Sequence, residues 1–202
     1  RLTSDKVQPA VVVTSRVEPG AQNTLWLVCA HDAPAEMTAS LPAVADAKWD
    51  DAFSVNVRNG EGYIIGVNPR SVLIGAYALL RAAGCRWVRP GKDGEVVPMR
   101  GVEALTLVKN EAASYRHRGI CIEGACSYEN IADIIDWAPK VGYNAYFTQF
   151  RESYTFFDRW YSHLGNPNKA AEPFTVEMAR TFLRQAQQRV ALVHHLPFAH
   201  ED

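Results

Sequence analysis

Residues 118–150, RGICIEGACSYENIADIIDWAPKVGYNAYFTQF, decide the fold of this chain. They open with a nearly continuous apolar run, RGICIE, which is typical of a strand buried on both faces. Residues 128–141 then repeat apolar side chains at spacings of three and four, which predicts a helix that ends at Gly142. The apolar and aromatic run at 143–150 predicts a second strand. Strand, helix and strand in this order predict a parallel βαβ unit.

The same alternation continues after residue 150. A long polar and aromatic loop covers residues 151–173, Thr175 is a good N-cap for a helix to about residue 188, and 190–196 predict a third strand. A closed (β/α)8 barrel takes about 250 residues, so three strands are too few to close one. We therefore expect residues 109–202 to be an incomplete α/β segment of TIM-barrel type, truncated from a longer protein. A smaller open α/β unit is the alternative.

The first 108 residues predict a separate α+β domain. Four apolar or β-branched runs predict strands, at residues 9–15, 24–30, 52–59 and 63–68. The last two form a hairpin around the Gly-Glu-Gly turn at 60–62. The clearest helix of this half has Ser71 as its N-cap and stops at Gly84. Residues 85–91 predict an extended segment, and residues 94–98 and 104–109 suggest one or two more short strands. Residues 109–114 lack apolar periodicity and predict the connector.

Composition excludes several classes of function. The 21 basic and 22 acidic side chains give a net charge of −1, which offers no basic field to nucleic acid or an anionic membrane. No segment has the roughly 18 uninterrupted apolar residues of a membrane helix. The four cysteines have no zinc-site spacing, and the adjacent His194 and His195 point to opposite faces of their strand. We expect no metal and no cofactor.

Three of the cysteines, Cys29, Cys85 and Cys121, lie among apolar neighbours, which predicts buried thiols. The chain begins at Arg1 with no charged-then-apolar leader, so we expect a fragment or a processed product. The sequence does not determine the compartment, although a cytoplasmic location is favoured over a secreted one.

The segment from Tyr115 to Glu152 resembles the first βαβ unit of the catalytic barrel in family 20 glycoside hydrolases, the β-N-acetylhexosaminidases. In that family an Arg-Gly pair opens the first strand, an acid follows five residues after the arginine, and an asparagine leads the second strand. Here these are Arg118, Glu123 and Asn144. The stretch GYIIGVNPRSVLIGAYALLRAAGCRWVRPG resembles the small α+β (zincin-like) domain that precedes the barrels of hexosaminidases and α-glucuronidases.

The chain departs from the family pattern at three positions. Cys126 stands where the family has a second arginine, Glu123 stands for the usual Asp, and Gln149 stands for a His. These changes suggest a divergent branch that acts on a different sugar. The catalytic Asp-Glu pair of the family follows the fourth barrel strand. The resemblance therefore implies that this pair lies beyond Asp202 and that the chain alone is inactive.

The resemblance, and the place of the residues beside the strands, predict six substrate contacts: Arg118, Glu123, Gln149, Arg151, Glu152 and Trp160. An arginine suits sugar hydroxyls because its fork can bond two oxygens, but Arg118 can equally form an ion pair with Glu123. Glu123 is alternatively a solvated carboxylate, and the polar cluster at 149–152 a solvated loop start. Trp160 can stack on a sugar ring or pack its loop onto the barrel.

The leading hypothesis is the N-terminal portion of a glycoside hydrolase acting on a hexosamine-type or related glycoside, with a carbohydrate substrate and neither nucleic acid nor membrane as partner. Its uncovered strand edges predict a homo-oligomer or a strand-swapped assembly. The alternative is a non-catalytic carbohydrate-binding or interaction module, suggested by the aromatic loop. A Rossmann-like nucleotide enzyme is disfavoured because no GxGxxG follows a strand.

Overall fold

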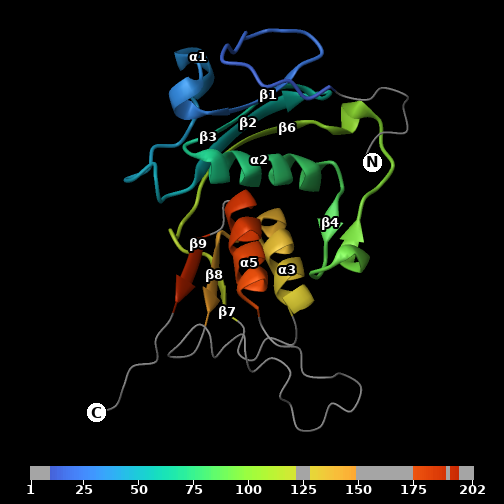
Figure 1. Cartoon of the computed structure of the whole chain (residues 1–202). Coiled ribbons are helices and arrows are strands. Elements are labelled where there is room, and N and C mark those ends of the chain that lie inside the picture. The colour runs from blue at the N-terminus through green and yellow to red at the C-terminus, as the bar shows by residue number, and fades with distance from the viewer. Residues whose placement is uncertain (1–9, 122–127, 149–174, 190–191, 196–202) are drawn as a thin grey trace. The chain divides into compact units, whose positions relative to one another are not determined.

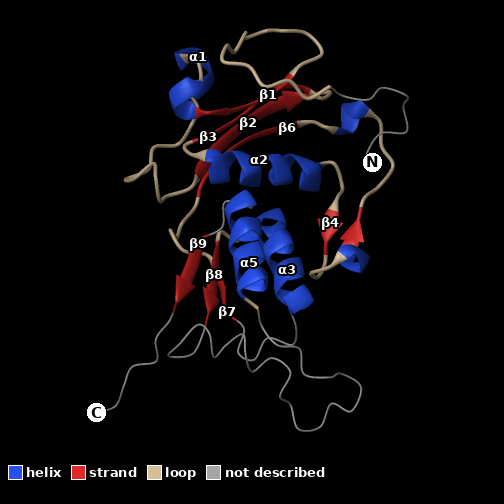
Figure 2. Cartoon of the chain, viewed as in Figure 1, coloured by secondary structure: helices blue, strands red, loops and turns tan. Residues whose placement is uncertain are grey.

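The computed structural model describes residues 10–121, 128–148, 175–189 and 192–195 (Figure 1). The chain divides into two compact units. The first comprises residues 1–88 and 94–116, and the second comprises 89–93 and 117–202. The described elements form a mixed α+β structure with several sheets, as the sequence predicts (Figure 2).

A four-stranded sheet in the order β1-β3-β2-β6 organises the first unit. Its strands are β1 (Leu25–Cys29), β2 (Ala52–Arg58), β3 (Glu61–Gly66) and β6 (Leu107–Ala112). Strand β3 runs parallel to β1 and antiparallel to β2, and β2 is antiparallel to β6. The predicted hairpin is confirmed, but its turn is formed by Asn59 and Gly60 and not by residues 60–62, since β3 already begins at Glu61. Asn59 and Gly60 take the φ values of 52° and 82° that a two-residue turn between such strands requires.

Helix α2 (Pro69–Ala82) covers one face of this sheet, and α1 (Ala35–Thr38) with the segment before β1 lies on the other (Figure 1). The core under α2 is apolar and consists of Phe53, Val55, Val57, Ile64, Ile74, Ala78 and Leu79. The predicted N-cap at Ser71 is wrong. Asn68 is the N-cap, and its side chain accepts a hydrogen bond from the Ser71 N–H at 2.9 Å. Pro69 takes the first helical position, where a missing N–H costs nothing.

The start of α2 holds a buried ion pair. Arg70 Nε donates to Asp51 Oδ1 at 2.8 Å, and the side chains are only 5% and 3% exposed. The Ser71 hydroxyl donates to the same carboxylate oxygen at 3.1 Å, and Arg70 also donates to the Trp49 carbonyl at 3.0 Å. Because each charged group has several partners, the pair fixes the loop before β2 against the start of α2.

Several short elements lie between the longer ones in residues 30–104. Strands β4 (Arg86–Trp87) and β5 (Glu95–Val96) form an antiparallel pair. The 3-10 turns are η1 (Ala30–Asp32), η2 (Lys92–Gly94) and η3 (Val102–Ala104).

Two expectations for this half are corrected. Residues 10–15 form no strand, and Val11, Val12 and Val13 are 92%, 76% and 97% exposed, because β-branched composition cannot make a strand without a partner. The connector expected at 109–114 is largely the second half of β6, which pairs with β2. Its side chains are polar because this edge strand faces solvent there, which explains the missing apolar periodicity.

The second unit holds three parallel strands in the order β7-β8-β9. These are β7 (Gly119–Cys121), β8 (Ala145–Thr148) and β9 (Leu192–His195). Helix α3 (Tyr128–Trp137), extended by η4 (Ala138–Val141), lies between β7 and β8 in the chain, and α5 (Val176–Gln188) lies between β8 and β9. The predicted caps are confirmed: Gly142 has a φ of 97°, and Thr175 Oγ1 accepts from the Met178 N–H.

The two helices pack together on one face of this sheet. Tyr146 of β8, only 2% exposed, meets Phe182 of α5 edge-to-face with ring centroids 6.0 Å apart. Since side chains alternate along a strand, Phe147 projects from the opposite face. The Phe147 ring occupies the space that a Cβ at Gly119 would need. The glycine that opens β7 is therefore required by close packing across the strand pair.

The thiols are not all buried. Cys85 is buried as predicted, but Cys29 is partly buried and Cys121 is exposed. Cys121 pairs in register with Phe147, on the face away from the helices. No helix in the described part of the chain combines the length and apolar character needed to cross a membrane.

Candidate functional site

The carboxyl ends of the three parallel strands meet at one edge of the second unit. Cys121 pairs with Phe147, and Phe147 pairs with His194, so the strand ends are in register. Glu123 follows the last residue of β7 by two positions, and Gln149 directly follows β8. The structure thus brings the carboxyl ends of β7 and β8 to one edge of the sheet, and the predicted polar segments follow these two strand ends in the sequence.

Five of the six predicted contact residues lie outside the described residues: Glu123, Gln149, Arg151, Glu152 and Trp160. Their substrate contacts stay predictions, as do the alternatives of a solvated rim and a packed aromatic loop.

Arg118 is described, and it lies at the opposite, amino end of β7. Its Nε donates to the Gly142 carbonyl at 2.9 Å, and its backbone N–H donates to Asn144 Oδ1 at 2.8 Å. The Asn144 N–H returns a bond to the Arg118 carbonyl at 3.0 Å. These contacts give Arg118 a role in aligning β7 with β8. A contact between its guanidinium and a sugar stays a prediction.

A charged cluster in the same unit has a structural role. Asp136 accepts hydrogen bonds from Lys140 at 2.5 Å and from Arg189 Nε at 2.8 Å. Burial raises the pKa of Asp136, but the hydrogen bonds and charges of Lys140 and Arg189 outweigh it and hold the pKa below its usual range. The cluster links the end of α3 to the residue that follows α5.

Tyr146 of β8 also has a perturbed pKa. Burial, with a smaller contribution from Cys121, raises the pKa of its hydroxyl. The hydroxyl oxygen is buried and has no hydrogen-bond partner among the described residues. Because the hydroxyl stays protonated near neutral pH and faces the helices, it is a poor candidate for proton transfer at the strand ends.

A pocket of about 430 Å³ lies in the first unit, on the sheet face opposite α2. The register explains which side chains line it. Trp26 of β1 pairs with Tyr63 of β3, and Tyr63 pairs with Asn56 of β2. The next row toward the hairpin turn pairs Glu61 with Arg58. One face of three adjacent strands therefore presents two aromatic rings beside an amide and two charged groups.

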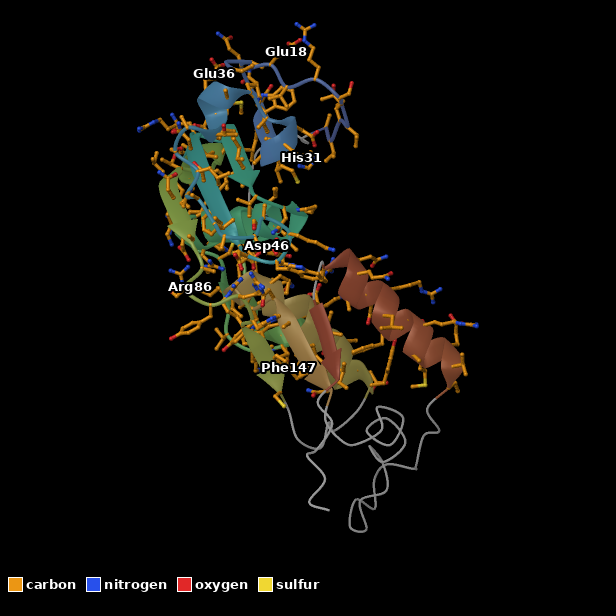
Figure 3. All side chains as sticks on the ribbon, turned by 90° about the vertical axis from the view of Figure 1, so that its left-hand side faces the viewer. Glu18, His31, Glu36, Asp46, Arg86 and Phe147 are labelled. Atoms are coloured by element: carbon orange, nitrogen blue, oxygen red, sulfur yellow. The ribbon has the colours of Figure 1, made fainter. Side chains whose placement is uncertain are left out.

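Helix α1 borders one side of the pocket. Met37, 3% exposed, belongs to the small core of Val28 and Ile65, against which Trp26 and Tyr63 also pack. Glu36 lines the pocket from α1, as does the segment 19–21 before β1. Figure 3 shows Glu36 at the same end of the first unit as Glu18. This site was not predicted from the sequence. The alternation of side-chain direction along β1 and β3 was the available signal, because it puts Trp26 and Tyr63 each on a defined face of its strand.

No group of three or more His, Cys, Asp or Glu side chains suited to a metal ion occurs within the described ranges. Comparison with protein-family models and with curated proteins found no match to this chain.

Proposed function

We propose that this chain is the N-terminal portion of a glycoside hydrolase related to the family 20 β-N-acetylhexosaminidases. It would supply an accessory α+β unit and the first βα units of a TIM-type barrel. One observation carries the proposal: β7, β8 and β9 are parallel and neighbour each other in chain order, with a described helix in each crossover. A (β/α)8 barrel begins in this way.

The same strand order also occurs in one half of a doubly wound nucleotide-binding sheet. One feature of the sequence favours the barrel. The residues that follow β7, IEGACS, lack the GxGxxG that would cradle a pyrophosphate. Cys121 is exposed on the sheet face away from α3 and α5, and Phe147 on that face is only partly buried. Further strands of a closed barrel would cover this face, as would the second helix layer of a doubly wound sheet, so the exposed face does not separate the two folds.

The proposed chemistry divides between binding and cleavage. Glu123, Gln149, Arg151 and Glu152 follow strand carboxyl ends, where barrel enzymes bind substrate, and their polar groups suit sugar hydroxyls. Hydrolysis of the glycosidic bond by water requires two suitably spaced carboxyl groups. In this proposal that pair belongs to later strands, so the 202-residue chain binds part of the substrate without cleaving it.

Hydrolysis assays test this function. The natural protein that contains this chain should release chromophore from at least one aryl glycoside in a panel of N-acetylhexosaminides, hexosides and hexuronides. The 202-residue chain should release none. Glu123→Gln and Glu152→Gln should each lower kcat/KM at least about tenfold, the loss expected for one charged hydrogen bond. Glu103→Gln, an exposed residue of the first unit, is the matched control.

Three outcomes would overturn the proposal in whole or in part. A natural protein that ends at residue 202 would remove the barrel. Failure of the natural protein to cleave any glycoside in the panel would remove the activity. Turnover by the 202-residue chain would contradict the assignment of cleavage to later strands.

A further inference from the structure

We propose that the pocket between α1 and the β1-β3-β2 sheet face binds a neutral saccharide unit, independently of the chemistry of the second unit. The floor of the pocket is formed by one sheet face, because its central residues are register partners on adjacent strands. Its volume of about 430 Å³ is within the range of small-molecule sites.

The floor of the pocket is aromatic. Trp26 and Tyr63 are both half-buried, and Met37 packs in the same small core. The indole Nε1 of Trp26 is buried without a hydrogen-bond partner in the described part of the chain, so the surface that Trp26 offers a ligand excludes this nitrogen. An aromatic carbon surface suits the C–H face of a pyranose ring, which is flat, rigid and weakly apolar.

The rim of the pocket is polar and charged. Glu36, Arg58 and Glu61 are exposed, and none of their side chains forms an ion pair or hydrogen bond with another described residue. Asn56 has one weak contact, a 3.4 Å hydrogen bond from Nδ2 to the Tyr63 hydroxyl. These groups are free to exchange water for ligand hydroxyls. Carboxylates accept from hydroxyl protons, and the guanidinium and amide donate to hydroxyl oxygens.

The charge balance of the rim selects among ligands. Two carboxylates and one guanidinium give the lining a formal charge of −1, so phosphates and sugar acids meet net repulsion. A peptide or lipid would need a longer apolar groove than this single aromatic floor. A neutral, hydroxyl-rich ring satisfies both parts of the pocket.

Titration of the isotope-labelled 202-residue chain tests the site by NMR. The probes are methyl β-glucopyranoside, N-acetylglucosamine, glucosamine and glucuronate. A neutral sugar should produce saturable shifts at the Trp26, Tyr63 and Asn56 signals, and glucuronate should bind at least about threefold more weakly. Two results would overturn the proposal: no saturable shift at these residues with either neutral sugar, or binding of only the charged probes.

Variants identify the floor and the rim. Trp26→Ala and Tyr63→Ala should weaken binding by about threefold to tenfold, since an aromatic contact contributes about 0.5–1.5 kcal/mol. Trp49→Ala is the matched control, because Trp49 is an exposed aromatic of the same unit outside the pocket lining. Unchanged affinity in both floor variants would refute the site.

The rim supplies variants that do not endanger folding. Arg58 and Asn56 are exposed, so Arg58→Ala and Asn56→Ala should keep the melting temperature while reducing affinity about threefold or more. If both bind sugar as tightly as the original chain, the assigned pocket is wrong. The hydrolysis assays report on the second unit, so either proposal can fail while the other stands.

Discussion

Arg118 and Asn144 bind each other twice across the amino ends of β7 and β8. The Arg118 N–H donates to Asn144 Oδ1 at 2.8 Å, and the Asn144 N–H donates to the Arg118 carbonyl at 3.0 Å. Asn144 is only 2% exposed, so water has little access to replace it. The asparagine that leads the second strand of the sequence pattern thus has a structural purpose, which is to set the register of two parallel strands.

Replacing Asn144 with alanine should free the Arg118 amide. The variant loses a buried acceptor, which costs about 1–3 kcal/mol of unfolding free energy. Hydrogen exchange at the Arg118 amide should accelerate more than at the amides of β7, which begins at the next residue. Asn110→Ala, an exposed site on β6, should leave that exchange rate unchanged. Equal protection of Arg118 in both variants would contradict the paired arrangement.

Gly119→Ala should destabilise the second unit, because the added Cβ would overlap the Phe147 ring. Overpacking of this kind costs about 1–3 kcal/mol. Phe147→Leu removes the ring, so Gly119→Ala should cost clearly less in that background. Urea unfolding of the two single variants and the double variant measures the coupling. Additive effects would show that the two side chains do not compete for the same space.

Arg70→Met should be among the most damaging substitutions in the first unit. It leaves the Asp51 carboxylate, 3% exposed, without its guanidinium partner, which costs about 3–5 kcal/mol. Adding Asp51→Asn should recover part of the loss, because no charge then stays buried. Chemical denaturation checks the ranking, with the exposed Arg100→Met as control. Equal losses for Arg70→Met and Arg100→Met would be inconsistent with the buried pair.

The Asp136 cluster predicts an acid-dependent stability. Its pKa is lowered in the folded protein, so its contribution is complete above the unfolded pKa of about 4 and is lost as pH falls through the folded value. Asp136→Asn should lower stability near pH 7 by at most about 1 kcal/mol, since the cluster is partly exposed. The difference from the original protein should vanish in acid. Thermal melts across this range, with Asp133→Asn as control, check the trend.

Local signals determined most of the elements correctly. Gly142 ends the helical segment that begins with α3, and Thr175 caps the start of α5, both as predicted. These signals are local, because a positive φ and an N-cap each depend mainly on a single residue. Asn68 is the cap in place of Ser71 because its side-chain amide also donates to two carbonyls of the loop before β2, those of Ala47 and Asp50, and the sequence does not show these contacts. Val11 to Val13 failed because a strand depends on a partner elsewhere in the chain.

The pocket was not predictable for a related reason. Alternation alone puts Trp26 on one face of its strand and Tyr63 on one face of another. Nothing in the sequence says that β1 pairs with β3 and not with β2, the next strand in the chain. For five of the six predicted contacts, all except Arg118, the sequence pattern suggests the residue types but not how the side chains are placed.

The late position of β6 has a consequence for synthesis of the chain. Ala52 of β2 pairs with Ala112 of β6, so the four-stranded sheet of the first unit cannot be completed until residues far along the chain have been synthesised. At roughly 5–20 residues per second, the ribosome exposes the unpaired edge of β2 for several seconds before β6 emerges. Nascent chains released within this interval would carry an open strand edge, which makes premature termination or a slow codon cluster before residue 107 a source of aggregation.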